Sequence, residues 1–240
     1  MPKPYVLAGI ILCVYSLAYA DVDFDTSLNL GLTLTDGNSE TMLGNASLTS
    51  AGELTAGSSL RLGIEGSYGE SKIDDQTQTT VENARGFLQL KHDVSKRWYA
   101  ALNVAASYDN IAEIDYRVIL GPAFGGYIIR SDNLRLTAEV GPSYLWERVS
   151  KVRDNYLVLR IAERLEYQLN ETAQIWQAAE FLPKTEEFDI FLINAEIGVS
   201  AAMTSRMSLR VVLQLSHDST PGPDLEKNDF TLISGLGIKL

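Results

Sequence analysis

The chain has 240 residues, a formal net charge of −11 and 45% hydrophobic residues. This acidic balance argues against a nucleic-acid partner, because proteins that bind phosphate backbones carry an excess of lysine and arginine. The length suits one large domain. The single cysteine, Cys13, lies near the start of the chain, where it supports neither a disulfide framework nor thiol chemistry in a processed protein.

Residues 1–20 have the pattern of a secretory signal peptide. Lys3 provides a positive start, an apolar run extends from Tyr5 to Leu17, and Ala18 and Ala20 are small residues that a signal peptidase accepts. The sequence therefore predicts cleavage between Ala20 and Asp21, with residues 21–240 as the mature domain.

Beyond this segment, apolar and polar residues alternate repeatedly. In the last segment, Phe230, Leu232 and Leu236 share one side of an extended chain. A period of two predicts strands with one apolar face, and about ten residues is the length that a tilted strand needs to cross a bilayer. The alternation is weak in the second segment and ambiguous in the ninth. The twelve predicted strands cover approximately residues 24–35, 41–54, 59–69, 79–91, 98–108, 115–124, 134–146, 157–167, 173–182, 191–199, 209–215 and 229–240.

The predicted connections differ between the two ends of these strands. Turns at residues 93–97, 130–133, 169–172 and 203–206 are short, whereas the alternate links at residues 69–78, 147–155 and 217–229 are longer or more polar. An even number of strands with short turns at one rim is typical of an outer-membrane barrel. We therefore predict an all-β fold, a transmembrane up-and-down antiparallel β-barrel of about twelve strands with both termini in the periplasm. A soluble periplasmic β-sandwich is the alternative.

Aromatic residues lie near both predicted rims, as in the girdles of membrane barrels. Trp98, Tyr99, Tyr167 and Trp176 lie beside the short turns, and Tyr68, Tyr108, Tyr116, Tyr144, Trp146, Tyr156 and Phe188 lie near the other rim. Glu163 does not fit the pattern, because it shares its parity with Ile161 and Leu165 and is predicted to face lipid unless a bulge shifts the register.

The polar face of the strands carries a group of charged residues that we expect to line the interior of the barrel. They are pore candidates, either as ion pairs that fill a narrow lumen or as the wall of a water-filled passage, and arginines outnumber acids among them. The group consists of Arg61, Glu65, Arg85, Asp115, Arg117, Arg135, Glu139, Arg160, Arg164, Glu166, Glu196 and Arg210.

Several sequence fragments resemble the family of salt-induced outer-membrane proteins (YdiY-like), whose function is unknown. The fragments are Gly31-Leu-Thr-Leu-Thr-Asp-Gly-Asn-Ser-Glu-Thr41, Arg97-Trp-Tyr99, Tyr108-Asp109, Ile114-Asp-Tyr-Arg117, Gly125-Gly-Tyr127 and Gly141-Pro-Ser-Tyr144. The resemblance extends from about Asp21 to Leu240 and implies an outer-membrane location in a Gram-negative bacterium. It implies no substrate and no catalytic residue. Such chains commonly end in an aromatic residue, whereas this one ends in Leu240.

Other polar motifs favour no specific chemistry. His217-Asp218-Ser219 contains the residue types of a hydrolase triad, but adjacent strand residues point to opposite faces. Asp74 and Asp75, with Glu70 nearby, lack the spacing of a calcium loop. Gly121-Pro-Ala-Phe-Gly-Gly126 has no helix after it and is not a phosphate loop. We predict no catalytic residue, metal or cofactor.

We rank three functional hypotheses by how well the sequence supports them. The first is a narrow channel or porin for small polar or anionic solutes, linked to salt or envelope stress through the family name. A non-conducting structural or binding barrel is the second, and an outer-membrane hydrolase is the third. The expected partners are outer-membrane lipid, lipopolysaccharide, the barrel-assembly machinery and small solutes.

Overall fold

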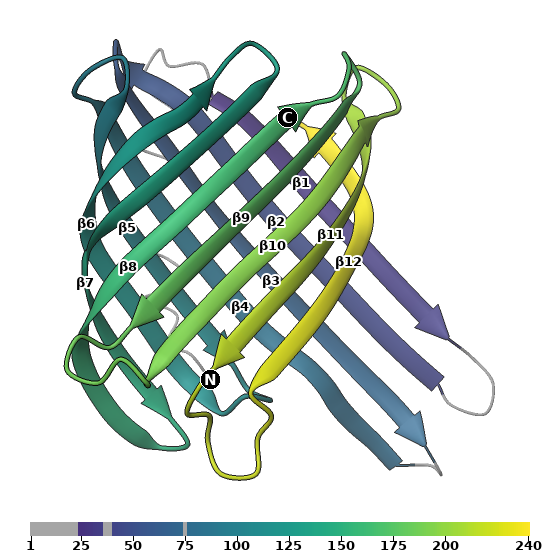
Figure 1. Cartoon of the computed structure of the whole chain (residues 1–240). Helices are drawn as coiled ribbons and strands as arrows, with labels where there is room; N and C mark the ends of the chain where they lie inside the picture. Colours follow the sequence, from purple (N-terminus) through teal and green to yellow (C-terminus); the bar gives the residue numbers. More distant parts are fainter. Residues whose placement is uncertain (1–23, 36–39, 74–75) are drawn as a thin grey trace.

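The computed structural model describes residues 24–35, 40–73 and 76–240, which form twelve antiparallel strands closed into a barrel (Figure 1). The predicted fold class is therefore confirmed, whereas the predicted signal peptide and its cleavage site, Ala20–Asp21, lie outside the described residues. No helix within the described ranges has the length and apolar character to cross a bilayer. The strands are β1 (Phe24–Thr35), β2 (Glu40–Thr55), β3 (Ser58–Ile73), β4 (Gln76–Asp93), β5 (Trp98–Asp109), β6 (Ile114–Arg130), β7 (Leu134–Val149), β8 (Val152–Gln168), β9 (Ala173–Pro183), β10 (Phe191–Ala202), β11 (Met207–Asp218) and β12 (Asn228–Lys239).

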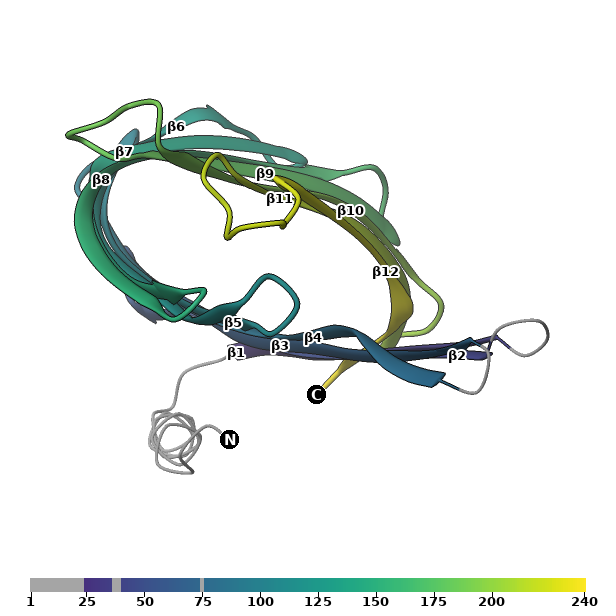
Figure 2. The ribbon, with the colours of Figure 1, turned by 90° about the horizontal axis from the view of Figure 1, so that it is seen from below.

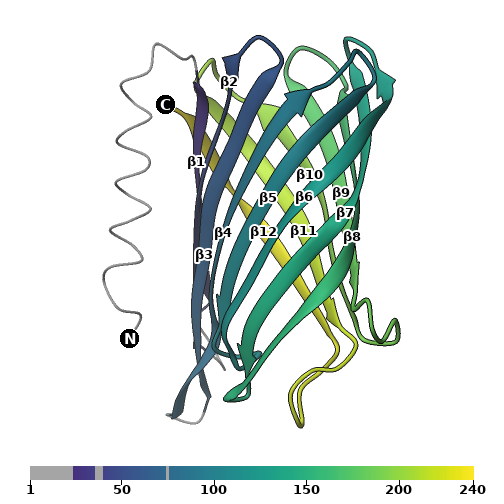
Figure 3. The ribbon, with the colours of Figure 1, turned by 90° about the vertical axis from the view of Figure 1, so that its left-hand side faces the viewer.

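Each strand pairs with its neighbours in sequence, and β1 pairs with β12 to close the ring. The strands are tilted with respect to the barrel axis (Figure 3). We call the end where β1 begins and β12 ends the terminal end, and the opposite end the loop end. The short turns predicted at residues 93–97, 130–133, 169–172 and 203–206 all lie at the terminal end, where the structure leaves residues 94–97, 131–133, 169–172 and 203–206 between the strands.

Several strands are longer than their sequence pattern predicts. β3 and β4 leave only residues 74–75 between them, and β7 and β8 leave only Ser150 and Lys151. Both residues of the latter turn have positive φ, 46° and 68°, as a two-residue hairpin turn of type I′ requires. The predicted long loops at residues 69–78 and 147–155 are therefore wrong. Backbone pairing continues there, but polar residues occupy both faces, so the alternation that marks a strand disappears.

The loop end carries two longer connections among the described residues. Residues 184–190 join β9 to β10, and residues 219–227 join β11 to β12. Viewed from this end, the barrel is oval and the β11–β12 loop lies over its opening (Figure 2). A Cβ atom on Gly222 of this loop would come within 2.2 Å of Ser150 Oγ. The loop therefore contacts the β7–β8 turn, on a separate part of the rim.

Apolar side chains cover the outside of the barrel. Leu32, Leu102, Phe124 and Ile197 are among the many large apolar residues that are at least 40% exposed. Their alternation with inward polar residues matches the predicted parity, and an apolar outer band is what a barrel in lipid requires. Part of the predicted aromatic girdle is wrong, because Tyr99 and Trp176 are buried and Tyr156 donates a hydrogen bond to Glu147 in the interior. Tyr99 and Tyr156 bond interior carboxylates, and the alternation of apolar and polar residues in the sequence does not predict these contacts.

The seam between β1 and β12 is the shortest ladder in the barrel. It comprises four pairs, from Ser27–Lys239 to Leu30–Leu236, whereas β1 and β2 pair over twelve positions. Beyond the seam, Leu34 on β1 is 67% exposed and Leu232 on β12 is 65% exposed. Residues 31–35 of β1 have no ladder partner on β12, so the two edge strands separate towards the loop end, and in Figure 1 β1 (purple) diverges from β12 (yellow).

Paired cysteines test where this seam ends. Cysteines at Leu28 and Ile238, which are ladder partners, should form a disulfide on oxidation, because bridging requires Cα atoms about 4.4–6.8 Å apart. Cysteines at Leu34 and Leu232, which would be partners if the register continued, should remain reduced. Non-reducing electrophoresis of residues 21–240, which contain no native cysteine, reports both outcomes. Equal cross-linking of the two pairs would show that the seam is fully closed.

Candidate functional site: the charged interior

The barrel encloses a cavity of about 1220 Å³ that is lined by residues from all twelve strands. Eleven of the twelve predicted interior residues line it: Arg61, Glu65, Arg85, Arg117, Arg135, Glu139, Arg160, Arg164, Glu166, Glu196 and Arg210. Asp115 does not line the cavity. Its side chain is 49% exposed and forms an ion pair with Arg148 at 3.0 Å, next to an irregularity in the β6–β7 register. The role of these residues in a pore stays a prediction.

Glu139 on β7 is the centre of the largest polar network in the interior. Its side chain is 8% exposed and accepts hydrogen bonds from Tyr99 on β5 at 3.0 Å and Gln89 on β4 at 3.0 Å. Arg160 on β8 bonds Glu139 at 2.7 Å and Glu180 on β9 at 2.5 Å. Side chains from five strands therefore converge on one buried carboxylate and its guanidinium partner.

A second ion-pair group crosses the interior near the loop end. Arg117 on β6 bonds Glu147 on β7 at 2.6 Å and Asp218 on β11 at 2.7 Å. The β6 and β11 strands are not neighbours in the sheet, so the second contact bridges separate walls of the barrel. It also fixes the end of β11, from which the β11–β12 loop departs.

An apolar cluster lies on the wall between these two groups. Leu145, Val158, Leu182 and Leu192 come from β7, β8, β9 and β10 and are almost fully buried, with Ile119 and Tyr156 packed against them. Each of these strands therefore contributes an inward apolar residue as well as an outward apolar row. Because of this cluster, part of the interior on the β7–β10 side is filled rather than wet.

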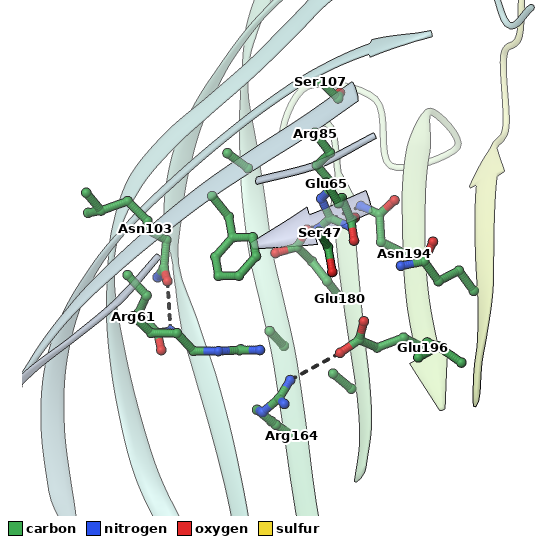
Figure 4. A pocket seen from close by; sticks show the side chains of 18 of the residues that line it. Ser47, Arg61, Glu65, Arg85, Asn103, Ser107, Arg164, Glu180, Asn194 and Glu196 are labelled. Atoms are coloured by element: carbon green, nitrogen blue, oxygen red, sulfur yellow. Dashed lines mark hydrogen bonds and ion pairs between the residues drawn. The ribbon is translucent and has the colours of Figure 1, made fainter. Parts of the chain in front are cut away.

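The third charged group lies in the terminal half. Arg164 bonds Glu166 at 2.8 Å and Glu196 at 3.3 Å, and Arg135 bonds Glu166 at 3.5 Å. Figure 4 shows Arg61 extending from its own wall towards Arg164 and Glu196. Both carboxylates of this group are therefore engaged by the arginines of β7 and β8.

Three further interior cations lie over aromatic rings. Arg61 lies 5.1 Å from the ring centroid of Phe87, Arg210 lies 4.5 Å from that of Trp176, and Lys91 lies 4.6 Å from that of Tyr99. Trp176 itself packs flat against the wall, because a Cβ atom on Gly198 would come within 2.1 Å of its ring. Among the described residues, none of these three cations has a carboxylate within ion-pair distance.

The interior also contains acids that the sequence pattern missed. Glu147, Glu180 and Asp218 all pair with predicted interior arginines. Glu180 lies on the strand with ambiguous parity, and the other two lie near strand ends that were predicted to be loops. The predicted excess of arginine over acids is thus neutralised in the centre and at the loop end. In the terminal half, Glu166 and Glu196 offset it only in part. Asp25 and Asp93 also line the cavity there, but they pair with Lys239 and Arg130, and Glu53 lines it near the end of β2.

Glu163 faces outward, as its parity predicts. Its ladder partners are Ala138 and Ala179, and it accepts a hydrogen bond from Gln177 of β9. The pair lies in a hollow of the outer surface whose other residues include Trp98 and Phe124. The amide satisfies one carboxylate oxygen, which lowers the cost of an acidic group on an apolar surface.

The residues considered for a hydrolase do not form a triad. His217 bonds Asn228 at 2.7 Å, Asp218 pairs with Arg117, and Ser219 Oγ accepts the backbone N–H of Phe191 at 2.8 Å. Of the acidic residues considered for a cation, Glu70 accepts a hydrogen bond from Tyr68, and Asp74 and Asp75 lie outside the described residues. Within the described ranges, no group of three or more acidic, histidine or cysteine side chains is arranged to hold a metal.

Replacement of Glu139 tests the central network. Glu139→Ala leaves Arg160 with one carboxylate and leaves buried donors without an acceptor, so the free energy of unfolding should fall by roughly 3 kcal/mol. Urea unfolding of the refolded barrel, followed by tryptophan fluorescence, measures the change. Glu171→Ala, in an exposed turn, is the control and should change stability by less than about 0.5 kcal/mol. Equal effects would mean that the network does not stabilise the barrel.

The fold is shared with known outer-membrane proteins. The NanC porin aligns with a TM-score of 0.55 at 9% identity over 90% of this chain and 100% of the porin. An outer-membrane channel from Pseudomonas putida F1 aligns with a TM-score of 0.50 at 11% identity over 91% of this chain and 94% of the channel. These similarities concern the fold. Comparison with curated proteins finds no match. Residues 28–240 match a family model, and the chain therefore belongs to the family described as "Protein of unknown function, DUF481".

Proposed function

We propose that the protein is a narrow channel of the bacterial outer membrane through which small polar and anionic solutes diffuse. The observation that carries this proposal is the cavity of about 1220 Å³, which polar and charged side chains from every strand line. Charged residues inside a barrel must be paired or wet. The unpaired cations in the terminal half favour water and anions at that level of the lumen.

The environment of the barrel is part of the same proposal. Its apolar outer face suits lipid and the lipid portion of lipopolysaccharide, and its strand edges suit insertion by the barrel-assembly machinery. A role in salt or envelope stress rests on the resemblance to salt-induced outer-membrane proteins. Expression measured at low and high osmolarity tests that link separately from transport.

Planar-bilayer recordings test the channel directly. Refolded residues 21–240 should produce steady single-channel steps in KCl, and the reversal potential across a salt gradient should show a preference for anions. The preference should weaken as the salt concentration rises, because mobile ions screen the lumen charges. A bilayer that stays silent after verified insertion would overturn the proposal.

The ion pair between Arg117 and Asp218, which crosses the lumen, allows a second test of the channel. Asp218→Asn weakens the contact between Arg117 and β11 but leaves the Arg117–Glu147 pair intact. The loop-end passage should widen, and single-channel conductance should rise. Asp115→Asn is the matched control, because Asp115 pairs with Arg148 away from the cavity lining, and it should leave conductance unchanged. The reverse pattern would place Asp115 in the permeation path.

A sealed structural barrel is the second candidate. The apolar cluster around Leu145 and Val158 and the Arg117–Asp218 bridge favour it, because both occupy space in the interior. Such a barrel would bind lipopolysaccharide or an envelope partner through its outer surface. It predicts verified insertion without conductance for wild type and Asp218→Asn alike.

A further inference from the structure

Three arginines from separate parts of the barrel wall meet in the terminal half of the lumen. Arg61 of β3, Arg164 of β8 and Arg210 of β11 each lie near the terminal end of their strand. Figure 4 shows Arg61 extending towards Arg164, and the three charges act on one another. All three line the cavity, and Figure 4 shows Arg61 and Arg164 pointing into it. We call these three residues the arginine cluster.

The nearby carboxylates do not balance the cluster. Glu166 and Glu196 both bond Arg164, and Glu166 is shared with Arg135. Glu65, the other carboxylate near Arg210, pairs with Arg85 at 4.0 Å. Three carboxylates therefore face five guanidinium groups, those of Arg61, Arg85, Arg135, Arg164 and Arg210. The guanidinium groups repel one another, and the repulsion is stronger in a narrow lumen with protein walls than in bulk water. The arrangement leaves an excess of positive charge on Arg61 and Arg210.

These two side chains also have unused hydrogen-bond donors. Among the described residues, neither Arg61 nor Arg210 donates a hydrogen bond, and the buried Nε of Arg210 has no partner. The rings of Phe87 and Trp176 hold the two guanidinium groups from one side. A cation–π contact orients a guanidinium but leaves its in-plane N–H groups free.

We propose that the arginine cluster is a binding site for the oxyanion group, carboxylate or phosphate, of a small solute within the lumen. A planar guanidinium binds such a group through two parallel hydrogen bonds. Arg61 and Arg210 offer two of these forks, beside Arg164, whose own guanidinium is engaged by Glu166 and Glu196. The site rests on the proposed channel function in one respect, because its ligand reaches it through the lumen.

The geometry also distinguishes this site from the other two charged groups. Arg160 is bonded by two carboxylates and Arg117 by two others, so these guanidinium groups have no charge left to offer. A solute anion would have to displace a protein carboxylate there. In the arginine cluster it would instead relieve repulsion between cations.

Calorimetric titration of the refolded protein in detergent tests the site. The probes are glucuronate, glucose 6-phosphate and, as an uncharged ring of the same size, glucose. We expect one or both anions to bind and glucose not to bind, and the stronger of the two anions identifies carboxylate or phosphate as the preferred group. Absence of binding by both anions would overturn the proposal.

Variants locate the binding. Arg61→Gln and Arg210→Gln should each weaken anion binding about tenfold or more, the effect of losing a charge-assisted hydrogen bond, and both should fold because they remove unpaired charge. Arg61→Lys and Arg210→Lys keep the charge without the fork and should weaken binding less. Arg97→Gln, on an exposed terminal-end turn, is the control for net charge. Undiminished binding in the cluster variants, or an equal loss in Arg97→Gln, would refute the site.

The proposed channel and the proposed anion site can be refuted separately. Conductance without anion binding would leave the channel in place and remove the site. Anion binding that depends on Arg61 and Arg210, in a protein that inserts but does not conduct, would establish the site and remove the channel.

Discussion

Closure of the β-ladder is the constraint on which the rest of this structure depends. In hydrocarbon a backbone N–H or C=O group without a partner is costly, and a closed ring of strands removes almost every unpaired edge. Closure then divides the side chains into two populations, because neighbouring residues in a strand point to opposite faces. The apolar population faces outward, and the charged population is confined to a narrow interior where each member needs a partner or water.

The pairing of the interior charges differs along the barrel axis. At the loop end and in the centre, carboxylates from β7, β9 and β11 neutralise Arg117 and Arg160, and an apolar cluster fills the wall between them. In the terminal half, aromatic rings take the place of carboxylates beside Arg61 and Arg210. A ring holds a cation in place without cancelling its charge. The interior arginines are therefore neutralised in two zones of the lumen, and the proposed anion site lies in the third.

The two ends of the barrel differ in the length of their connections and in the pairing of their edge strands. At the terminal end, short turns join the strands, and the C-terminal Leu240 donates its backbone N–H to Thr26 at 3.0 Å. At the loop end, the strands extend beyond the apolar band, the β1–β12 seam has already ended, and the β11–β12 loop reaches the β7–β8 turn. Any widening or narrowing of the passage is thus expected at the loop end, while the arginine cluster stays on the better-paired half of the wall.

The sequence by itself determined the strand number, the antiparallel barrel class, the cavity-lining position of eleven of the twelve predicted charged residues and the outward position of Glu163. All of these follow from a period of two, which is a local property of the chain. Only the tertiary structure decided which charges meet, because Arg117 and Asp218 are 101 residues apart and Gln89 and Glu139 are 50 apart. It also decided that Tyr99 and Trp176 turn inward and that the polar hairpin ends remain strands. Pairing across a lumen depends on the curvature and register of the whole ring, and no pattern within a single strand encodes either.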